Sequence, residues 1–197
     1  MIVLLGLAGS GKGTQGKILS EIFGWKWLSV GEAIRQTGKY KEMTDAGELI
    51  PDEDVVKLMG ERIQKAEEEG FDVVLDGYPR DEAQARYLTE TMPDKIDGVI
   101  VIDVPKEELF RRLALRGRDD DKERASIERR FMFFDNNITP MINLFKGKNI
   151  PVEYVNGVGS VEEVAGRLVA VAKEMNPDAR EQENDMNNDG TEQSYGE

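Results

Sequence analysis

The feature that most constrains this chain is a run of glycines that directly follows a short apolar segment. Residues 2–5 read Ile-Val-Leu-Leu, and residues 6–14 read Gly-Leu-Ala-Gly-Ser-Gly-Lys-Gly-Thr. The apolar segment is typical of a strand buried in a parallel sheet. After the glycines, four apolar residues share one helical face: Ile18, Leu19, Ile22 and Phe23. A strand, a glycine-rich turn and an amphipathic helix in this order predict an α/β unit.

The glycine-rich turn has the composition of a phosphate-binding loop. It nearly fits the pattern G-x-x-x-x-G-K-[ST], with Gly6, Gly11 and Lys12 in register. The departure is Gly13, which follows the lysine and moves the hydroxyl group to Thr14. Glycines let several backbone N–H groups point at one anion, and the helix that begins here adds the positive end of its dipole. We therefore expect this turn to bind phosphate, since a turn used only for packing would need neither the lysine nor so many glycines.

Strand and helix patterns alternate along the rest of the chain. Short apolar runs predict further strands over 25–30, 71–75, 98–104 and 152–155. Amphipathic patterns predict helices over 32–40, 51–70, 81–91, 105–116, 124–146 and 161–173. The alternation predicts an α/β fold in one domain, with a five-stranded parallel sheet and right-handed crossovers.

Composition excludes several kinds of chemistry. The 197 residues include no cysteine and no histidine, so disulfides, histidine-dependent triads and zinc sites built from these residues are excluded. Catalysis must then use lysine, arginine, carboxylates, hydroxyls, backbone amides or a hard cation bound by oxygen. The net charge of −13 argues against a nucleic-acid or anionic-membrane surface. Without a secretory pattern or an apolar run near the ~20 residues that span a bilayer, we expect a cytoplasmic location.

Charge is unevenly distributed along the chain. Residues 175–197 hold seven acidic side chains against one arginine, and we expect them to form a disordered acidic tail. Seven arginines lie close together further upstream: Arg111, Arg112, Arg116, Arg118, Arg124, Arg129 and Arg130. Two interpretations of these arginines stay open, a local anion site or a solvated helix face with ion pairs. Arg112 and Arg129 are the two that we expect at the surface.

Later segments of the chain resemble, in order, the motifs of the adenylate kinases, which belong to the nucleoside monophosphate kinases. The glycine after the loop lysine is itself typical of this family. The other matching segments are LSVGEAIR (28–35), GELIPD (47–52), DGYPR with Gln84 (76–84), RGRDDD with Ile127 to Arg130 (116–130) and VNGVGS (155–160). Together with the glycine-rich turn they cover residues 1–174, and the ordered set is far more specific than any one motif.

The resemblance implies a function and a more detailed fold. The function is reversible, Mg²⁺-dependent transfer of the γ-phosphoryl group from ATP to AMP, which gives two ADP, by a cytoplasmic monomer. The fold is a three-layer α/β/α P-loop fold with strand order 2-3-1-4-5. Residues 1–174 would form the kinase domain, with a shortened insert for the nucleoside monophosphate over 31–52 and a minimal lid over 116–124. The lid would hold no structural zinc, because the chain lacks the ligands.

Site residues follow from the resemblance by matching position. The ATP site would comprise Gly9, Ser10, Gly11, Lys12, Gly13, Thr14, Arg116 and Gly159. The AMP site would comprise Val30, Arg35, Glu48, Leu49, Ile50, Gly77, Tyr78, Pro79, Arg80, Gln84, Arg118 and Arg130. Catalytic contacts to the phosphates would come from Lys12, Arg80, Arg118 and Arg130. Thr14 and Asp76 would help to hold Mg²⁺ through waters, together with the ATP phosphates.

The sequence departs from the family pattern in three places. Val30 replaces the usual threonine, 14 residues separate Arg35 from Ile50, and a single residue separates Arg116 from Arg118. These changes leave two alternatives open: another nucleoside monophosphate kinase, for UMP, CMP or GMP, or a nucleotide-binding regulatory protein with weak turnover. The retained arginines predict that a short lid still closes over the site and excludes water.

Overall fold

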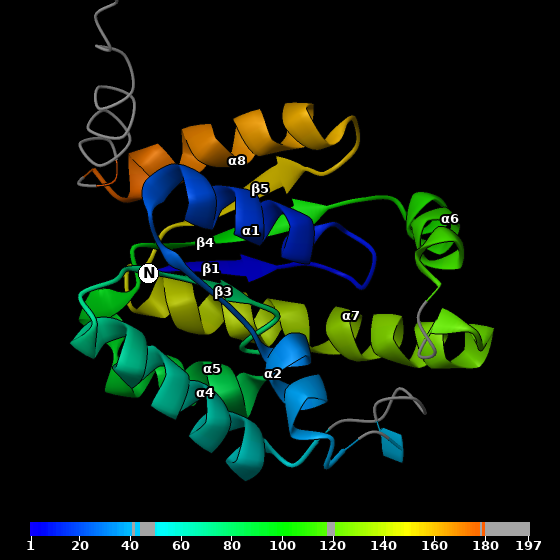
Figure 1. Cartoon of the computed structure of the whole chain (residues 1–197), viewed down its shortest axis with the longest axis horizontal. Helices are drawn as coiled ribbons and strands as arrows, with labels where there is room; N and C mark the ends of the chain where they lie inside the picture. Colours follow the sequence, from blue (N-terminus) through cyan, green and yellow to red (C-terminus); the bar gives the residue numbers. More distant parts are fainter. Residues whose placement is uncertain (41, 44–49, 118–120, 178, 180–197) are drawn as a thin grey trace, which may run out of the picture.

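A five-stranded parallel sheet forms the centre of the molecule. The computed structural model describes residues 1–40, 42–43, 50–117, 121–177 and 179. The strands lie in the order β2-β3-β1-β4-β5 (Figure 1). They are β1 (Ile2–Leu5), β2 (Lys26–Ser29), β3 (Val73–Asp76), β4 (Gly98–Asp103) and β5 (Val152–Asn156). The predicted fold class and strand order are therefore confirmed.

Helices follow the strands much as the sequence patterns predict. In the described ranges they are α1 (Lys12–Phe23), α2 (Val30–Thr37), α4 (Asp52–Glu68), α5 (Glu82–Thr91), the short 3₁₀ helix η1 (Pro93–Lys95), α6 (Lys106–Arg116), α7 (Arg124–Gly147) and α8 (Val161–Met175). None of these helices is long and apolar enough to cross a bilayer.

The helices form a layer on each face of the sheet. α1 and α8 cover one face, and α4, α5 and α7 cover the other (Figure 1). The sequence of β1 is continuously apolar because both of its faces are covered. Val3 and Leu5 pack against one layer of helices, and Ile2 and Leu4 pack against the other. All four side chains are buried, as expected for a central parallel strand covered on both sides.

The strand order places a topological switch beside β1. The chain runs from β1 to β2 and β3 on one side, and later to β4 and β5 on the other. Connections that leave in opposite directions open a crevice at the carboxyl ends of the strands, which is where open α/β sheets bind ligands. The turns after β1, β3 and β5 all begin at this edge.

Most element boundaries differ by one to three residues from the sequence-based prediction, and two of these differences have a structural consequence. Val30 was predicted to end a strand, but it begins α2, because the Ser29 hydroxyl accepts a hydrogen bond from the Glu32 N–H and caps the helix. At the other end of the chain, α8 continues to Met175, and Ala179 is still buried. The insert and the lid predicted over 31–52 and 116–124 lie partly outside the described residues, and so does most of the predicted acidic tail.

Candidate active site

A cavity of about 720 Å³ opens at the carboxyl edge of the sheet. Its walls come from the turn after β1, the start of α2, the turn after β3, helices α6 and α7, and the turn between β5 and α8. Eight of the lining side chains are basic: Lys12, Lys17, Arg35, Arg80, Arg111, Arg112, Arg116 and Arg130. Three are acidic: Glu32, Asp76 and Glu108. In a chain whose net charge is −13, this excess of positive charge identifies the cavity as a site for an anion.

The turn after β1 has the backbone of a phosphate-binding loop. Gly9 and Gly11 have φ angles of +86° and +98°, which glycine adopts far more readily than other residues. Gly11 is also the N-cap of α1, so the N-terminus of this helix opens toward the cavity. A Cβ atom at Gly9 would lie 3.0 Å from Leu113 Cγ and 3.2 Å from the Leu109 carbonyl oxygen. The glycine therefore also lets α6 pack directly against the loop.

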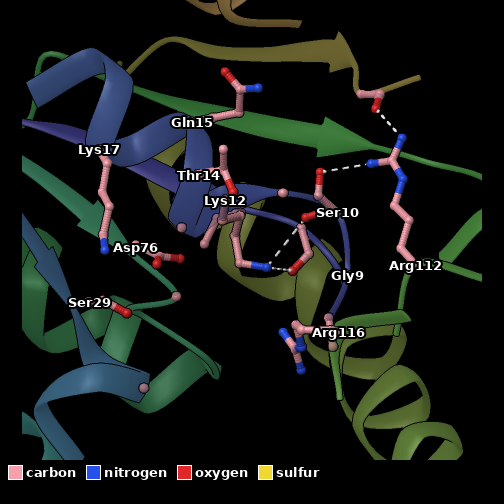
Figure 2. Close-up of a pocket in the computed structure, with 18 of the residues that line it drawn as sticks. Gly9, Ser10, Lys12, Thr14, Gln15, Lys17, Ser29, Asp76, Arg112 and Arg116 are labelled. Carbon is pink, nitrogen blue, oxygen red and sulfur yellow. Dashed lines mark hydrogen bonds between the residues drawn. The ribbon is translucent and has the colours of Figure 1, made fainter. Parts of the chain in front are cut away.

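Lys12 lies at the centre of this loop (Figure 2). Its Nζ donates hydrogen bonds to the carbonyl oxygens of Gly6 and Leu7, at 2.7 and 3.0 Å, and contacts Ser10 Oγ at 3.4 Å. Burial lowers the pKa of Lys12 to about 8. Asp76 opposes this shift, and three arginines of the cavity reinforce it. Such an ammonium group is poised to bind an anion, since an anionic ligand would relieve the cost of its burial.

Asp76 ends β3 and faces the same loop (Figure 2). Its carboxyl group lines the cavity, and the residue is 7% exposed. A Cβ atom on Gly13 would touch Asp76 Oδ2 at 3.4 Å, so the unusual glycine after the lysine lies directly against this carboxylate. Within the described residues, no group of three acidic side chains could hold a metal ion alone. One carboxylate and the Thr14 hydroxyl fit a hard cation that arrives with phosphate oxygens and keeps several waters.

Arginines from four elements complete the cavity with Lys12. Arg35 comes from α2, Arg80 from the turn after β3, Arg116 from α6 and Arg130 from α7. A Cβ atom at Gly31 would lie 3.3 Å from Arg35 Nη1 and 3.7 Å from Arg80 Nη2, so these two guanidinium groups lie beside each other over a glycine. The predicted site residue Arg118 lies outside the described residues.

The buried carboxylate of Asp121 forms hydrogen bonds with two of these arginines. Asp121 accepts two hydrogen bonds from Arg116, at 2.6 and 2.7 Å, and one from Arg130 at 2.9 Å. Its side chain is 2% exposed. Burial alone would raise the pKa of Asp121, but the hydrogen bonds from the two arginines outweigh burial and hold this pKa below its ordinary value. Of the three neighbouring aspartates, Asp121 is the one that the structure describes.

Arg112 is a cavity residue that the sequence analysis did not assign. It was expected at the surface, yet its side chain is 23% exposed and lines the cavity. Its guanidinium group donates to the carbonyl oxygens of Ser10 and Gly157, at 3.5 and 3.0 Å (Figure 2). The carboxylate of Glu108, one helical turn earlier, accepts a hydrogen bond from Arg112 Nε. Arg129, in contrast, is exposed as expected.

The residues predicted for the AMP site differ in their relation to the cavity. Arg35, Gly77, Pro79, Arg80 and Arg130 line it. Val30, Ile50, Tyr78 and Gln84 are 0–5% exposed and are not among the residues that line it. Glu48 and Leu49 lie outside the described residues. Of the residues predicted for the ATP site, 9–14, Arg116 and Gly159 all line the cavity. Phe133 and Phe134, which the sequence analysis did not assign, line it too.

Comparison with known proteins agrees with this architecture. The family model described as "Adenylate kinase" matches residues 4–150. An adenylate kinase from Leptospira biflexa is 34% identical over 184 residues, which cover 85% of this chain and 97% of the relative. One from Archaeoglobus fulgidus is 32% identical over 217 residues, with coverages of 88% and 98%. One from Methanothrix thermoacetophila is 34% identical over 211 residues, with coverages of 86% and 97%. The phosphate loop, the strand order and these relatives lead to one conclusion: this chain belongs to the adenylate kinase family.

Proposed function

We propose that the chain transfers the γ-phosphoryl group of ATP reversibly to AMP, in a Mg²⁺-dependent reaction that gives two ADP. The observation that carries this proposal is the convergence of Lys12, Arg35, Arg80, Arg116 and Arg130 on one cavity beside the phosphate loop. Two phosphorylated substrates need such an excess of positive charge, because phosphoryl transfer depends on positioning and on charge stabilisation. The relatives reported above are named adenylate kinases, which supports this proposal.

The reaction needs little covalent chemistry from the protein. An oxygen of the AMP phosphate forms a bond to the γ-phosphorus, and the bond to the oxygen that bridges the β- and γ-phosphates breaks. The nucleophile is already an anion, so no histidine or other general base is required. Lys12, Arg80, Arg118 and Arg130 would stabilise the charge that spreads over the transferred group. Mg²⁺, held by the ATP phosphates with Thr14 and, through waters, Asp76, would neutralise further phosphate charge.

The two substrates would occupy opposite ends of the cavity. The phosphate loop and the turn at Gly159 form the ATP side. The turn at Gly77–Arg80 and helix α2 form the AMP side, together with the insert proposed over 31–52. Arg112, which joins the phosphate loop to the turn at Gly157, belongs on the ATP side as well. A lid over 116–124 would carry its arginines onto the phosphates and exclude water.

A panel of acceptors tests the proposal directly. Purified protein is mixed with Mg-ATP and one of AMP, CMP, UMP or GMP, and formation of the nucleoside diphosphates is measured. We expect AMP to be the best acceptor. A stronger response to another monophosphate would identify a different kinase of the same class, to which the buried Val30 in place of threonine would then be relevant. Transfer to none of them would leave a nucleotide-binding regulatory role.

We also propose that the protein acts as a cytoplasmic monomer, with no nucleic-acid or membrane partner. The net charge of −13 supports the second part, because a strongly acidic chain is repelled by polyanions and by anionic lipid. Size-exclusion chromatography with light scattering should give one species of 22.1 kDa. A dimer peak would contradict the first part.

A further inference from the structure

Gln84 links three segments of the acceptor side of the molecule. Its Nε2 donates to Asp52 Oδ1 at 2.7 Å and to Asp81 Oδ2 at 2.9 Å. Its Oε1 accepts a hydrogen bond from the backbone N–H of Arg80 at 3.0 Å. The residue is 2% exposed. One buried amide therefore connects the start of α4, the start of α5 and the turn that carries a cavity arginine.

The two carboxylates fix the orientation of this amide. Both hydrogens of a side-chain NH₂ group are used when it donates to two carboxylates, and the amide oxygen must then face the other way. That oxygen meets the N–H of Arg80, whose side chain lines the cavity. Asp81 also caps α5 by accepting the N–H of Gln84 at 2.9 Å.

Asp81 is in an environment that favours its protonated form. Burial raises the pKa of Asp81 to about 6, hydrogen bonds from backbone N–H groups oppose the rise, and Asp52 adds to it. Tyr78 is an ionisable neighbour of this pair, and its pKa is raised by burial and by the nearby Tyr87 and both carboxylates. Tyr78 is therefore neutral near pH 6.

Helix α7 and the turn at Arg80 also lie beside α5. α7 packs on α5 through apolar residues that include Met141 and Ile142. The Arg80 guanidinium group is directed to the Gly77 carbonyl oxygen at 3.1 Å and lies over Gly31. Asp81 is thus the carboxyl group of this network whose pKa is raised, and Asp52 is the carboxylate beside it.

We propose that Asp81, acting with Asp52, is a positioning residue for the acceptor nucleotide: the two carboxylates hold the Gln84 amide, and this amide holds the Arg80 turn to the start of α4. The inference rests on the proposed function, because it assumes that a nucleoside monophosphate binds beside Arg80. Asp81 itself does not line the cavity. It therefore acts through the Gln84 amide and the Arg80 turn, and not by contact with the substrate.

Protonation changes the strength of this link. A protonated Asp81 can donate to Asp52, which joins α4 and α5 directly. When both groups are ionised they repel each other, and the Gln84 amide alone bridges them. The acceptor site is therefore held more firmly below pH 6 than above it.

The variant Asp81→Asn keeps a donor to Asp52 at every pH. Asparagine caps helices as well as aspartate does, and its side-chain NH₂ group can donate to Asp52. This NH₂ group cannot accept the hydrogen bond from Gln84 Nε2, and that loss is the same at every pH. The AMP phosphate itself titrates near pH 6, so the measured quantity is the ratio of the wild-type KM for AMP to the variant KM. We expect this ratio to rise about 3- to 10-fold between about pH 5 and pH 7.5. The ratio for the KM of ATP should not change with pH.

Glu82→Gln is the matched control. It removes one negative charge from the same helical turn, but Glu82 pairs with Arg86 on the surface and does not contact Gln84. The ratio of the wild-type KM for AMP to the KM of this control variant should not change with pH. In an active enzyme, a constant ratio for Asp81→Asn as well overturns the positioning role alone. If the wild type does not transfer phosphate from ATP to AMP at all, the proposed function fails and this role fails with it.

Thermal unfolding gives a second readout that does not depend on activity. The pKa of Asp81 is higher in the folded protein than in the unfolded chain, so the folded state binds more protons between about pH 4 and 6 and the wild type loses stability as the pH rises through this range. The variant lacks this titration. The difference between the Tm of the variant and that of the wild type should shift in favour of the variant as the pH rises from about 4 to 6. A Tm difference that does not depend on pH overturns the assignment of the titrating group.

Discussion

Arg112 Nη2 donates a hydrogen bond to the Gly157 carbonyl oxygen at 3.0 Å, across 45 residues of sequence. The same guanidinium group reaches the Ser10 carbonyl oxygen at 3.5 Å, so one side chain joins the phosphate loop to the turn between β5 and α8. A Cβ atom on Gly157 would lie 2.6 Å from Ile102 Cγ2 and Val104 Cγ2. Glycine is therefore required at this position for the turn to lie against β4.

Removing this link should weaken ATP binding more than AMP binding. Arg112→Met keeps the length of the side chain but loses its donors. We expect the KM for ATP to rise about 10-fold, which is the usual effect of losing a charged hydrogen bond, with smaller changes in kcat and in the KM for AMP. Initial rates at varied concentrations of each substrate give these values.

Arg111→Met is the matched control for Arg112. Arg111 also bonds to Glu108, but its side chain is 63% exposed. We expect its effect on the KM for ATP to be small, because exposed ion pairs contribute little. Equal effects of the two substitutions would contradict a specific role for Arg112 in joining the loops.

Lys12→Met should make the free protein more stable while it removes activity. The folded protein lowers the pKa of Lys12 to about 8, so between about pH 8 and 10 the unfolded chain binds more protons, and stability rises with pH across this range. Near pH 7 the buried ammonium group is charged and destabilises the fold. The Tm of the variant should exceed that of the wild type at pH 7, by about 2–4 °C for each kcal/mol.

Tripolyphosphate provides the complementary measurement. An anion that pairs with Lys12 should raise the Tm of the wild type and have a smaller effect on the variant. A variant less stable than the wild type at pH 7 would show that the loop hydrogen bonds of Lys12 outweigh the cost of its burial.

Asp121→Asn should destabilise the protein by about 2–3 kcal/mol, because it removes the buried charge that Arg116 and Arg130 share. The pKa of Asp121 is held below its ordinary value, so its contribution is present at neutral pH and is lost as the pH falls below about 4. Urea unfolding at pH 7 measures the difference. Asp135→Asn, which breaks an exposed pair with Lys106, is the control and should cost less than about 1 kcal/mol.

Local patterns predicted most of the fold. Every predicted strand is present, and helix ends agree within a few residues, because buried parallel strands and amphipathic helices leave strong periodic signals. The start of α2 was missed although its signal is present: Ser29 stands three residues before Glu32, as in an N-terminal capping motif. An apolar Val30 in a run of apolar residues favoured the longer strand instead.

The sequence predicted the phosphate loop but not the full arrangement around it. Arg112 follows Glu108 by four residues, which is the spacing of an ordinary surface ion pair, and it does make that pair. Its contacts to Ser10 and Gly157 are long-range and leave no local pattern. Gln84 matched the family as a residue of the AMP site, but its partner Asp52 lies 32 residues earlier, so only the folded chain shows that its amide is already engaged.

The fate of the γ-phosphoryl group tests the central claim most directly. ATP labelled at the γ-phosphate is incubated with Mg²⁺ and AMP, and the label is followed into ADP and inorganic phosphate. We expect nearly all of it in ADP formed from AMP, almost none in inorganic phosphate when AMP is left out, and a loss of roughly 100- to 1000-fold in transfer rate for Lys12→Met. Label released as inorganic phosphate as fast without AMP as it is transferred with AMP, or undiminished transfer by Lys12→Met, would contradict a closed site built around Lys12.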